Sequence, residues 1–416
     1  RVRLSGDLLA TLFRVNLGIL VRDIQYSLQK SSKRKKFFSI KVLAKSTLFS
    51  HRVESAIATG SWTGERSGIT QNIDKTNYLA TISQLQRVSS MLPGDQENFM
   101  ARTLHPTHYG RFCPIETPEG TEIGLRKNLA ILARVSTRVE LDESKFMKDL
   151  ESLELNKEDI GNYDVFFNGM FIGTVNDGNK FVKQIREKRR ENQLPVQMSF
   201  REDEGIKTIY ISTESGRVLR PLIIVENGTS KLKSEHLVQI EQGEIKWKDL
   251  IEKGIIEYLD AAEEENALVA LNEESLTQEH THLEIDPVSL FGTVTSLVPY
   301  GNHDQSSRLN RGSKTQKQAL GLYSANYLCR LDTDVSILQY PQKPIVRSFV
   351  YDTLNTYPAG QNLVVAIMAY EGYNMEDALA LNKGSLDRGL GRSFYFRPYS
   401  AIEMNYAGGL KDEIAM

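Results

Sequence analysis

The first segment of the chain carries apolar side chains at a helical spacing. Leu8, Leu12, Val15 and Ile19 recur close to the period of an α-helix. This period gathers them on one face of the helix. We therefore expect an amphipathic helix over residues 1–30.

A second amphipathic pattern lies near residue 80. Leu79, Ile82 and Leu85 fall on one helical face. A Pro-Gly pair disfavours a continuing helix, because Pro lacks an N–H donor and Gly is conformationally free. We expect this helix to end near the pair Pro93-Gly94.

Between about residues 130 and 285 the pattern becomes strand-like. Short runs rich in β-branched and aromatic residues, such as 165–167 and 208–211, alternate with turn-forming pairs such as Asn168-Gly169. Runs separated in this way predict strands joined by tight turns. One charged surface helix is expected in the same region, over residues 183–190.

Beyond residue 286, Gly and Pro separate compact elements. The pattern predicts a helix over residues 314–328 and a buried strand around the apolar run 363–368. The fold class that follows is α+β with several modules, in which helices are mixed with small β-sheets.

Length and composition set the broad class of the protein. A chain of 416 residues exceeds one ordinary domain, so two to four units are expected. The content of 40% hydrophobic and 25% charged residues is typical of globular proteins. No apolar run is long enough to span a bilayer, and we expect no membrane association. Cys113 and Cys329 stand far apart, so we expect two buried thiols, no disulfide and no zinc site.

The net charge of −2 hides a strong segregation of charge along the chain. Residues 257–286 contain ten acidic side chains and no Lys or Arg, whereas residues 301–330 carry five Lys or Arg and one Asp. A polyanion would be repelled by the first block and attracted by the second. The alternative for the basic block is a solvated surface.

Residues 104–120 predict a defined loop. They contain two His, three Pro, two Gly, one Arg and two Glu. Each Pro fixes φ and removes a backbone donor, which excludes a regular helix or strand interior. We expect the polar groups of this loop to point at a partner.

A pair of adjacent carboxylates follows the apolar run in the last part of the chain. A strand that leads into a turn at Gly372 would present Glu376 and Asp377 at its end. Mg²⁺ is often bound by one or two carboxylates together with substrate phosphates. The alternative is a helix N-terminus with acidic residues in its first turn.

Two other segments carry cations and amides that suit a phosphate backbone. In the predicted helix, Lys314, Lys317, Gln318 and Gly321 share one face, and Gly321 would allow close approach. A solvated helix face is the alternative. The segment 341–344 is expected to be extended, because prolines flank Gln342 and Lys343 and display their side chains.

Together these segments resemble one family, the second-largest (β-type) subunit of multisubunit DNA-directed RNA polymerases. The resemblance is nearer to the archaeal and eukaryotic nuclear form than to the bacterial one. The matching segments keep the order of the family along the chain: residues 104–120, 254–261, 280–287, 302–306, 317–321, 340–344, 358–362 and 372–377.

The resemblance implies five modules. Residues 1–55 resemble the C-terminal part of the protrusion, 56–134 the fork, 135–215 and 216–285 the two external modules, and 286–416 the first half of a β-rich hybrid-binding region. The expected function is that of an RNA polymerase subunit, a nucleotidyltransferase in the assembled enzyme. The isolated chain is expected to be inactive and to be a fragment or a split form.

The resemblance also implies roles for particular residues. In the family, the acidic pair matched by Glu376 and Asp377 faces a second Mg²⁺ that arrives with the nucleoside triphosphate. Other matched positions contact the substrate or the nucleic acid. The implied substrate-binding residues are Arg308, Lys317 and Gln318, and the implied nucleic-acid contacts are Gln342, Lys343, Gln71 and Arg87.

Partners follow from the same resemblance. They are the largest polymerase subunit, small assembly subunits, the DNA template, the RNA–DNA hybrid and nucleoside triphosphates. The largest subunit would supply the tightly bound Mg²⁺. The location would be the cytoplasm with the nucleoid in an archaeon and the nucleus in a eukaryote. Two other hypotheses are an independent metal-dependent phosphoryl-transfer enzyme and a pure scaffold that binds no substrate.

The sequence also departs from the family near Arg308. Ser307 stands where the family has Pro, and Arg311 and Lys314 add cations in the segment before Lys317. The length of the segment, Arg308 and Lys317 are kept, but the resemblance does not determine the fine contacts of this segment.

Overall fold

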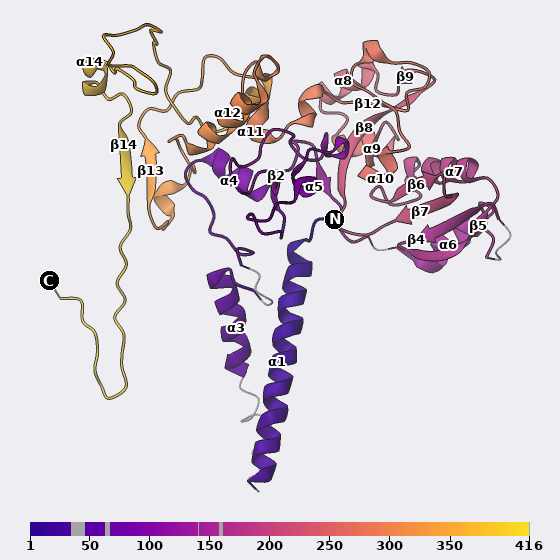
Figure 1. Ribbon diagram of the computed structural model, residues 1–416, viewed down its shortest axis with the longest axis horizontal. Helices are drawn as coiled ribbons and strands as arrows, with labels where there is room; N and C mark the ends of the chain where they lie inside the picture. The colour runs from indigo at the N-terminus through magenta and orange to yellow at the C-terminus, as the bar shows by residue number, and fades with distance from the viewer. Residues whose placement is uncertain (35–45, 63–66, 140, 158–160, 416) are drawn as a thin grey trace. The chain divides into compact units, whose positions relative to one another are not determined.

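The computed structural model describes most of the chain as two compact units. The described residues are 1–34, 46–62, 67–139, 141–157 and 161–415. Unit 1 comprises Arg1–Asn72 and Val88–Gly292, and unit 2 comprises Ile73–Arg87 and Thr293–Met416. Helices and several small sheets alternate along the chain (Figure 1), which confirms the predicted α+β class.

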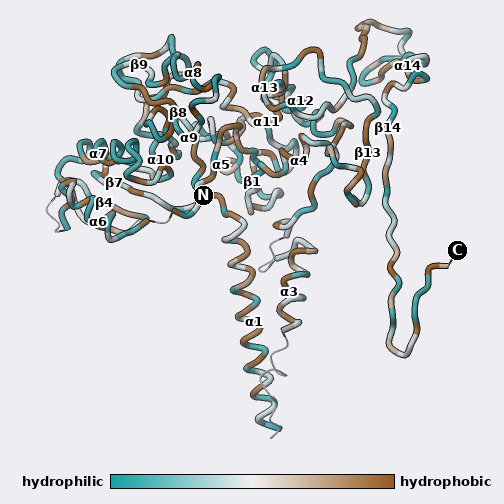
Figure 2. The backbone as a smooth tube through the Cα atoms, turned by 180° about the vertical axis from the view of Figure 1, so that it is seen from behind, coloured by the Kyte–Doolittle hydropathy of each residue, from teal (hydrophilic) through white to brown (hydrophobic). Residues whose placement is uncertain are grey.

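The first element of unit 1 is the long helix α1 (Ser5–Lys33), which confirms the predicted helix at the start of the chain. It packs beside α3 (Ser46–Thr59), and the two helices lie side by side in Figure 1. The rings of Phe13 and Phe49 meet edge to face with centroids 5.5 Å apart. Apolar positions recur along α1 in Figure 2.

A four-stranded sheet with two helices forms a second part of unit 1. The strand order is β5-β4-β7-β6, with β4 and β7 parallel and the other pairs antiparallel. Its elements are α6 (Glu143–Glu151), β4 (Tyr163–Phe167), β5 (Met170–Val175), α7 (Gly178–Arg190), β6 (Ser199–Asp203) and β7 (Thr208–Ser212). Both predicted strands are confirmed. Asn168 and Gly169 have φ of 49° and 84°, as a tight hairpin turn requires.

The six-stranded sheet of unit 1 is built around one long strand, β8 (Val218–Glu226). Seven consecutive residues of β8 are buried, because other parts of the unit cover both faces. The remaining elements are β3 (Arg134–Val135), β9 (Thr229–Ser230), α8 (Ser234–Glu241), α9 (Trp247–Glu252), β10 (Ile256–Leu259), α10 (Ala261–Glu264), β11 (Val269–Ala270), η2 (Glu273–Ser275), β12 (His282–Leu283) and η3 (Pro287–Leu290).

Short elements connect these parts. They are β1 (Arg87–Ser89), α5 (Phe99–Arg102), η1 (Pro106–His108) and β2 (Arg126–Asn128). No described helix is both long enough and apolar enough to cross a membrane.

Unit 2 has a small helical cluster and a two-stranded antiparallel ladder. Helices α4, α11 and α12 pack together, and β13 pairs with β14. The elements are α4 (Tyr78–Leu85), α11 (Thr293–Ser296), η4 (Gly301–His303), α12 (Ser306–Gln318), η5 (Tyr327–Cys329), β13 (Val335–Leu338), α13 (Phe349–Leu354), α14 (Lys383–Asp387) and β14 (Ser393–Phe396).

Two predicted helices have different bounds in the structure. Helix α4 exists but ends at Leu85, because the chain passes directly into β1. Helix α12 begins eight residues before the predicted start and stops at Gln318, where Ala319 adopts an extended conformation with ψ of 139°. The polar pattern continues past Gln318, so periodicity alone could not locate this end.

Two other predictions are wrong. The apolar run 363–368 forms no strand in the described chain, and Val364 and Ile367 are fully exposed. A strand needs a neighbouring strand to pair its backbone hydrogen-bonding groups. In this part of unit 2, β13 pairs with β14 and not with the run 363–368. Cys113 is buried as expected, but Cys329 is exposed.

Candidate functional site

Helix α12 presents its cations on the side opposite to its packed side. Leu309 and Ser313 are buried, and the Ser313 hydroxyl lies 3.0 Å from the hydroxyl of Thr295 on α11. Residues that are three positions apart lie slightly less than one turn from each other in a helix of 3.6 residues per turn, so they form an oblique row on its surface. The exposed side of α12 therefore carries a diagonal row of cations, Arg308, Arg311 and Lys314.

The predicted substrate residues on α12 are not gathered at one point. Arg308 lies in the first turn of the helix, whereas Lys317 and Gln318 form its last two positions. At 1.5 Å per residue, the two ends are separated by roughly 13 Å along the axis. Lys317 is half-buried and Gln318 is exposed.

Gly321 lies beyond the helix, so it does not share a helical face with Lys317. A Cβ at this position would lie 2.6 Å from the Cα of Ala359 and 2.7 Å from the carbonyl oxygen of Pro358. Only Gly tolerates such an approach. The backbone close to Gly321 in this structure is thus the protein's own loop.

The two loops that contain Gln342 and Asn362 are joined by hydrogen bonds. The backbone N–H of Gln342 donates to the carbonyl of Gly360 at 2.9 Å, and the backbone N–H of Asn362 donates to Oε1 of Gln342 at 2.9 Å. The side-chain amide of Asn362 donates to the carbonyl of Lys343 at 2.8 Å. Gln342 and Lys343 remain exposed on an irregular segment.

A cleft of about 290 Å³ lies next to these loops in unit 2. Its lining includes Leu79 of α4, Gln316 of α12, Gln342 and Asn362. The cleft therefore connects the end of α12 with the segment of Gln342 and Lys343. Its mixture of apolar and amide side chains resembles a binding surface rather than a metal site.

Asp332 is the centre of a charged cluster in unit 2. It pairs with Lys75 and accepts hydrogen bonds from the Tyr323 hydroxyl at 2.7 Å and from Nε of Arg330 at 3.1 Å. The hydrogen bond from Lys75 is the main cause that lowers the pKa of Asp332 to about 2. Burial, and then Asp332 itself, raise the pKa of Tyr323 to about 12.

This cluster predicts an acid-sensitive region. The folded pKa of Asp332 is about 2 and its ordinary value is 3.8, so its stabilisation is complete above pH 3.8 and is lost as the pH falls towards 2. In Asp332→Asn, pepsin cleavage near residues 323–338 should be faster at pH 4 but should rise less steeply towards pH 2. Asp334→Asn, at an exposed neighbour, is the control. Identical pH profiles for wild type and Asp332→Asn would contradict this prediction.

The predicted acidic pair lies in an exposed turn. Glu376 has φ of 55°, and both Glu376 and Asp377 are exposed. Asn374 fixes the turn, since it accepts from the backbone N–H of Tyr370 at 2.9 Å and donates to the carbonyl of Met368 at 2.6 Å. The pair does not begin a helix, so the alternative of an acidic first turn is wrong here. Within the described chain, no group of three His, Cys, Asp or Glu could hold a metal ion.

The two remaining predicted contacts fall in different units. Gln71 belongs to unit 1, and its side-chain amide donates to the carbonyl of Gly68 at 2.9 Å. Arg87 belongs to unit 2 and is the half-buried first residue of β1.

The loop of residues 104–120 points one of its polar side chains, Arg111, at the large sheet of unit 1. Arg111 is buried and donates to the carbonyls of Val218 at 3.1 Å and Leu259 at 3.0 Å. It also pairs with Glu264 at 2.5 Å. This loop is thus an anchor inside unit 1.

The acidic block was expected to repel a polyanion, and this expectation is wrong for its buried members. Other carboxylates of the block are exposed, namely Glu265, Glu273, Glu274, Glu279 and Asp286. Buried Arg189 lies 2.6 Å from Glu257 and 2.8 Å from Glu263. In the same region, Arg217 pairs with Asp260 at 2.9 Å. Charge counting missed this network, although the clustered arginines around position 189 were a signal that could have indicated partners.

The network shifts the pKa values of its members. Burial by itself would lower the pKa of Arg189, but Glu263 and Glu257 outweigh it and raise this pKa. Burial would likewise raise the pKa of Glu257, but Arg189, His282 and Arg190 hold it well below its usual value. Both shifts favour the charged forms of Arg189 and Glu257 inside unit 1.

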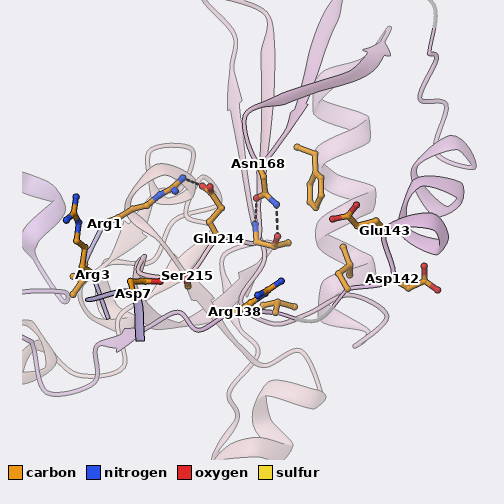
Figure 3. A pocket seen from close by; sticks show the side chains of 14 residues that line it. Arg1, Arg3, Asp7, Arg138, Asp142, Glu143, Asn168, Glu214 and Ser215 are labelled. Carbon is orange, nitrogen blue, oxygen red and sulfur yellow. Dashed lines mark hydrogen bonds and ion pairs between the residues drawn. The ribbon is translucent and has the colours of Figure 1, made fainter. Parts of the chain in front are cut away.

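A larger cavity of unit 1 contains none of the predicted site residues. Its lining contains both cations and carboxylates. Arg138 comes from the chain before α6, and Asp142 and Glu143 lie at the start of that helix (Figure 3). Asn168 and Thr213 are joined there by two hydrogen bonds of 2.9 Å. Positive and negative side chains are mixed in this lining. We therefore assign neither an anion nor a metal ion to this cavity.

Four family models match the chain in order. They describe RNA polymerase Rpb2 domain 3 at residues 71–135, domain 4 at 165–226, domain 5 at 247–287 and domain 6 at 294–416. Together they cover more than half of the chain.

Curated relatives agree with these models. The chain is 43% identical to the DNA-directed RNA polymerase subunit Rpo2 of Sulfolobus acidocaldarius, an alignment that covers 100% of this chain and 38% of the relative. It is 35% identical to the DNA-directed RNA polymerase II subunit RPB2 of Encephalitozoon cuniculi, in an alignment that covers 99% of this chain and 38% of the relative. It is 34% identical to the DNA-directed RNA polymerase III subunit RPC2 of Saccharomyces cerevisiae, in an alignment that covers 100% of this chain and 38% of the relative.

The chain thus spans about 38% of the length of these relatives. The similarity runs along all of it and is stronger towards the archaeal subunit than towards the eukaryotic ones. The chain belongs to the family of second-largest subunits of DNA-directed RNA polymerases, in their archaeal and eukaryotic form.

Proposed function

We propose that this chain is part of a DNA-directed RNA polymerase, in which it contributes contacts to the nucleotide-addition site and holds the RNA–DNA hybrid. The largest subunit completes the active site, and the chain alone is inactive. Small assembly subunits, the DNA template and nucleoside triphosphates are its other partners. The five modules predicted from the sequence belong to this proposal, as does a nucleoid or nuclear location.

The observation that carries the proposal is the cationic side of α12. The row of Arg308, Arg311 and Lys314 is held outward because Leu309 and Ser313 fix the opposite side of the helix. Protein–nucleic acid affinity comes largely from Lys and Arg that neutralise phosphates. Such a row can follow the backbone of a hybrid, while Arg308 at one end reaches a triphosphate.

The end of α12 and the adjoining loop supply the second part of the surface. Lys317 and Gln318 lie at the helix end, and Gln342 and Lys343 lie on the segment beyond the cleft. Amides and cations of this kind position a strand through its phosphates and sugars without reading its sequence. That behaviour suits an enzyme that must accept every transcript. Gln71 and Arg87 are proposed as further contacts to the nucleic acid.

Glu376 and Asp377 fit a transient Mg²⁺. Both carboxylates are exposed, and no third ligand accompanies them within the described chain. A site of this kind needs substrate phosphates and water to complete its coordination, which matches an ion that arrives with the nucleotide. When bound, Mg²⁺ would neutralise the charge that builds on the phosphates during transfer.

Replacement of Lys317 by Ala tests this proposal. In the assembled polymerase, the loss of one charge-assisted contact should cost about 1.5–3 kcal/mol, or roughly a 10- to 150-fold higher nucleotide requirement. The measurement is the elongation rate on a synthetic RNA–DNA scaffold as the nucleotide concentration is lowered.

The matched control is Lys383→Ala, which removes an exposed cation of α14 in the same unit. Its elongation rate should equal that of the wild type at every nucleotide concentration. An unchanged rate for Lys317→Ala at limiting nucleotide would speak for the scaffold hypothesis.

A further inference from the structure

Asn77 connects α4 with α12, the helix that carries the proposed contact residues. It precedes α4 and is buried, with 1% of its surface exposed. Its side-chain oxygen accepts from the backbone N–H of Ala80 at 2.7 Å, which caps α4. Its side-chain NH₂ group donates to the carbonyls of Gln316 and Ala319, each at 2.8 Å.

The second pair of hydrogen bonds closes the end of α12. The last four carbonyls of a helix have no partner within the helix, and a Gly in the left-handed conformation often closes this end. Here Ala319 follows the helix in an extended conformation, with φ of −70° and ψ of 139°. The carbonyl of Gln316 accepts from the Asn77 amide at 2.8 Å and also, over a longer 3.4 Å, from the backbone N–H of Ala319.

The position of these bonds in the sequence is what matters for function. Lys317 and Gln318 are the two residues between the carbonyl groups that Asn77 holds. One buried side chain therefore fixes the backbone on both sides of the two proposed contact residues.

Asn77 is itself held in place from α4. The backbone N–H of Asp74 donates to Oε1 of Gln84 at 2.7 Å, and the Thr81 hydroxyl donates to the carbonyl of Asp74 at 2.5 Å. The residues just before Asn77 are thus fastened to the side of α4. A shift of α4 would be transmitted to the end of α12.

We propose that Asn77 is a positioning residue for nucleotide addition, which acts through the Lys317-Gln318 end of α12. This inference rests on the proposed function of Lys317. The chemistry of the side chain supports it: Ser, Thr and Asp cap helices as well as Asn does, but only an amide accepts one hydrogen bond there and donates two others.

The experiment uses polymerase assembled with Asn77→Ser. Ser keeps an oxygen that can cap α4 and removes both donors to α12. The control is Asn382→Ser in the same unit, where Asn382 caps α14 by accepting from Ser385 at 3.0 Å and lies exposed. Rates are expressed per active enzyme, counted by titration of active sites.

We expect Asn77→Ser to raise the apparent KM for nucleotide about 3- to 10-fold and to change kcat by less than about 2-fold, since a contact is displaced rather than deleted. Asn382→Ser should match the wild type in both constants. If Asn77→Ser does not assemble, Asn77→Thr removes the same donors and gives the same comparison.

A double variant distinguishes positioning from a general effect on structure. If Asn77 acts through Lys317, then Asn77→Ser should add little to the defect of Lys317→Ala. If the increases in KM of the two single variants multiply in the double variant, the inference is overturned. An unchanged KM for Asn77→Ser beside a raised KM for Lys317→Ala would also overturn it. A normal KM for Lys317→Ala would instead defeat the proposed function, and the inference with it.

Discussion

Polymerase assembled with Asp377→Ala is expected to add nucleotides about 10²-fold more slowly than the wild-type enzyme. Asp377 and Glu376 are exposed carboxylates on a turn that Asn374 holds in place. In the proposed site, Asp377 helps to hold the Mg²⁺ that arrives with the nucleotide, so part of the lost rate should return as Mg²⁺ is raised. The measurement is single-nucleotide addition followed by rapid quench over a series of Mg²⁺ concentrations.

Asp387→Ala is the control for this experiment. Asp387 is the last residue of α14 in the same unit, and it is also an exposed carboxylate. Its removal changes the net charge equally but should leave the rate unchanged. Full-speed addition by Asp377→Ala would exclude the metal assignment and reduce the acidic pair to a structural turn.

The largest effect on stability is expected from Arg189→Ala. Arg189, Glu257 and Glu263 are all buried, and Arg189 also donates to the carbonyl of Met198 at 2.6 Å. Arg189→Ala takes one cation away from two buried carboxylates, and breaking a buried ion pair typically costs about 3–5 kcal/mol. The free energy of unfolding should therefore fall by this amount. Both tryptophans, Trp62 and Trp247, lie in unit 1, so their fluorescence in urea reports its unfolding.

Arg201→Ala provides the matched control for buried charge. Arg201 pairs with Glu265 at 3.0 Å, but its side chain is 37% exposed. An exposed ion pair contributes about 0–1 kcal/mol, so this variant should unfold close to the wild type. Equal decreases in the free energy of unfolding for Arg189→Ala and Arg201→Ala would show that burial of the ion pairs does not set their contribution to stability.

Acid should weaken the same network. The folded pKa of Glu257 lies well below its ordinary value of 4.5. Its stabilisation is thus complete above about that pH and is lost as the pH falls towards the folded pKa.

The sequence predicted those elements whose pattern is local. Helix α1 and strands β4 and β7 follow from the spacing of their own apolar residues, and the turn at Asn168-Gly169 follows from its residue types. Helix α12 was misplaced because its polar pattern has no local stop signal. At its actual end, the carbonyls of Gln316 and Ala319 accept hydrogen bonds from Asn77, which is more than 200 residues away in the sequence.

Charge was the least predictable property of the fold. The acidic block was counted correctly, but whether a carboxylate faces water or a buried arginine depends on which segments pack together. The arginine partners of Glu257 and Glu263 lie on α7, which precedes them by more than 60 residues. Residues 104–120 pointed to a partner for the same chemical reason, and only the fold identified that partner as the sheet around β8.

By itself, the sequence determined the α+β class, the local helices and strands, and the ordered motifs that mark the polymerase family. The tertiary structure alone decided that the buried members of the acidic block join an internal network, that the apolar run 363–368 is exposed, and that Asn77 bonds to the end of α12. The physical reason is the range of the interactions. Backbone propensity and side-chain period act between near neighbours, whereas desolvated ion pairs and shared helix caps exist only once distant segments have met.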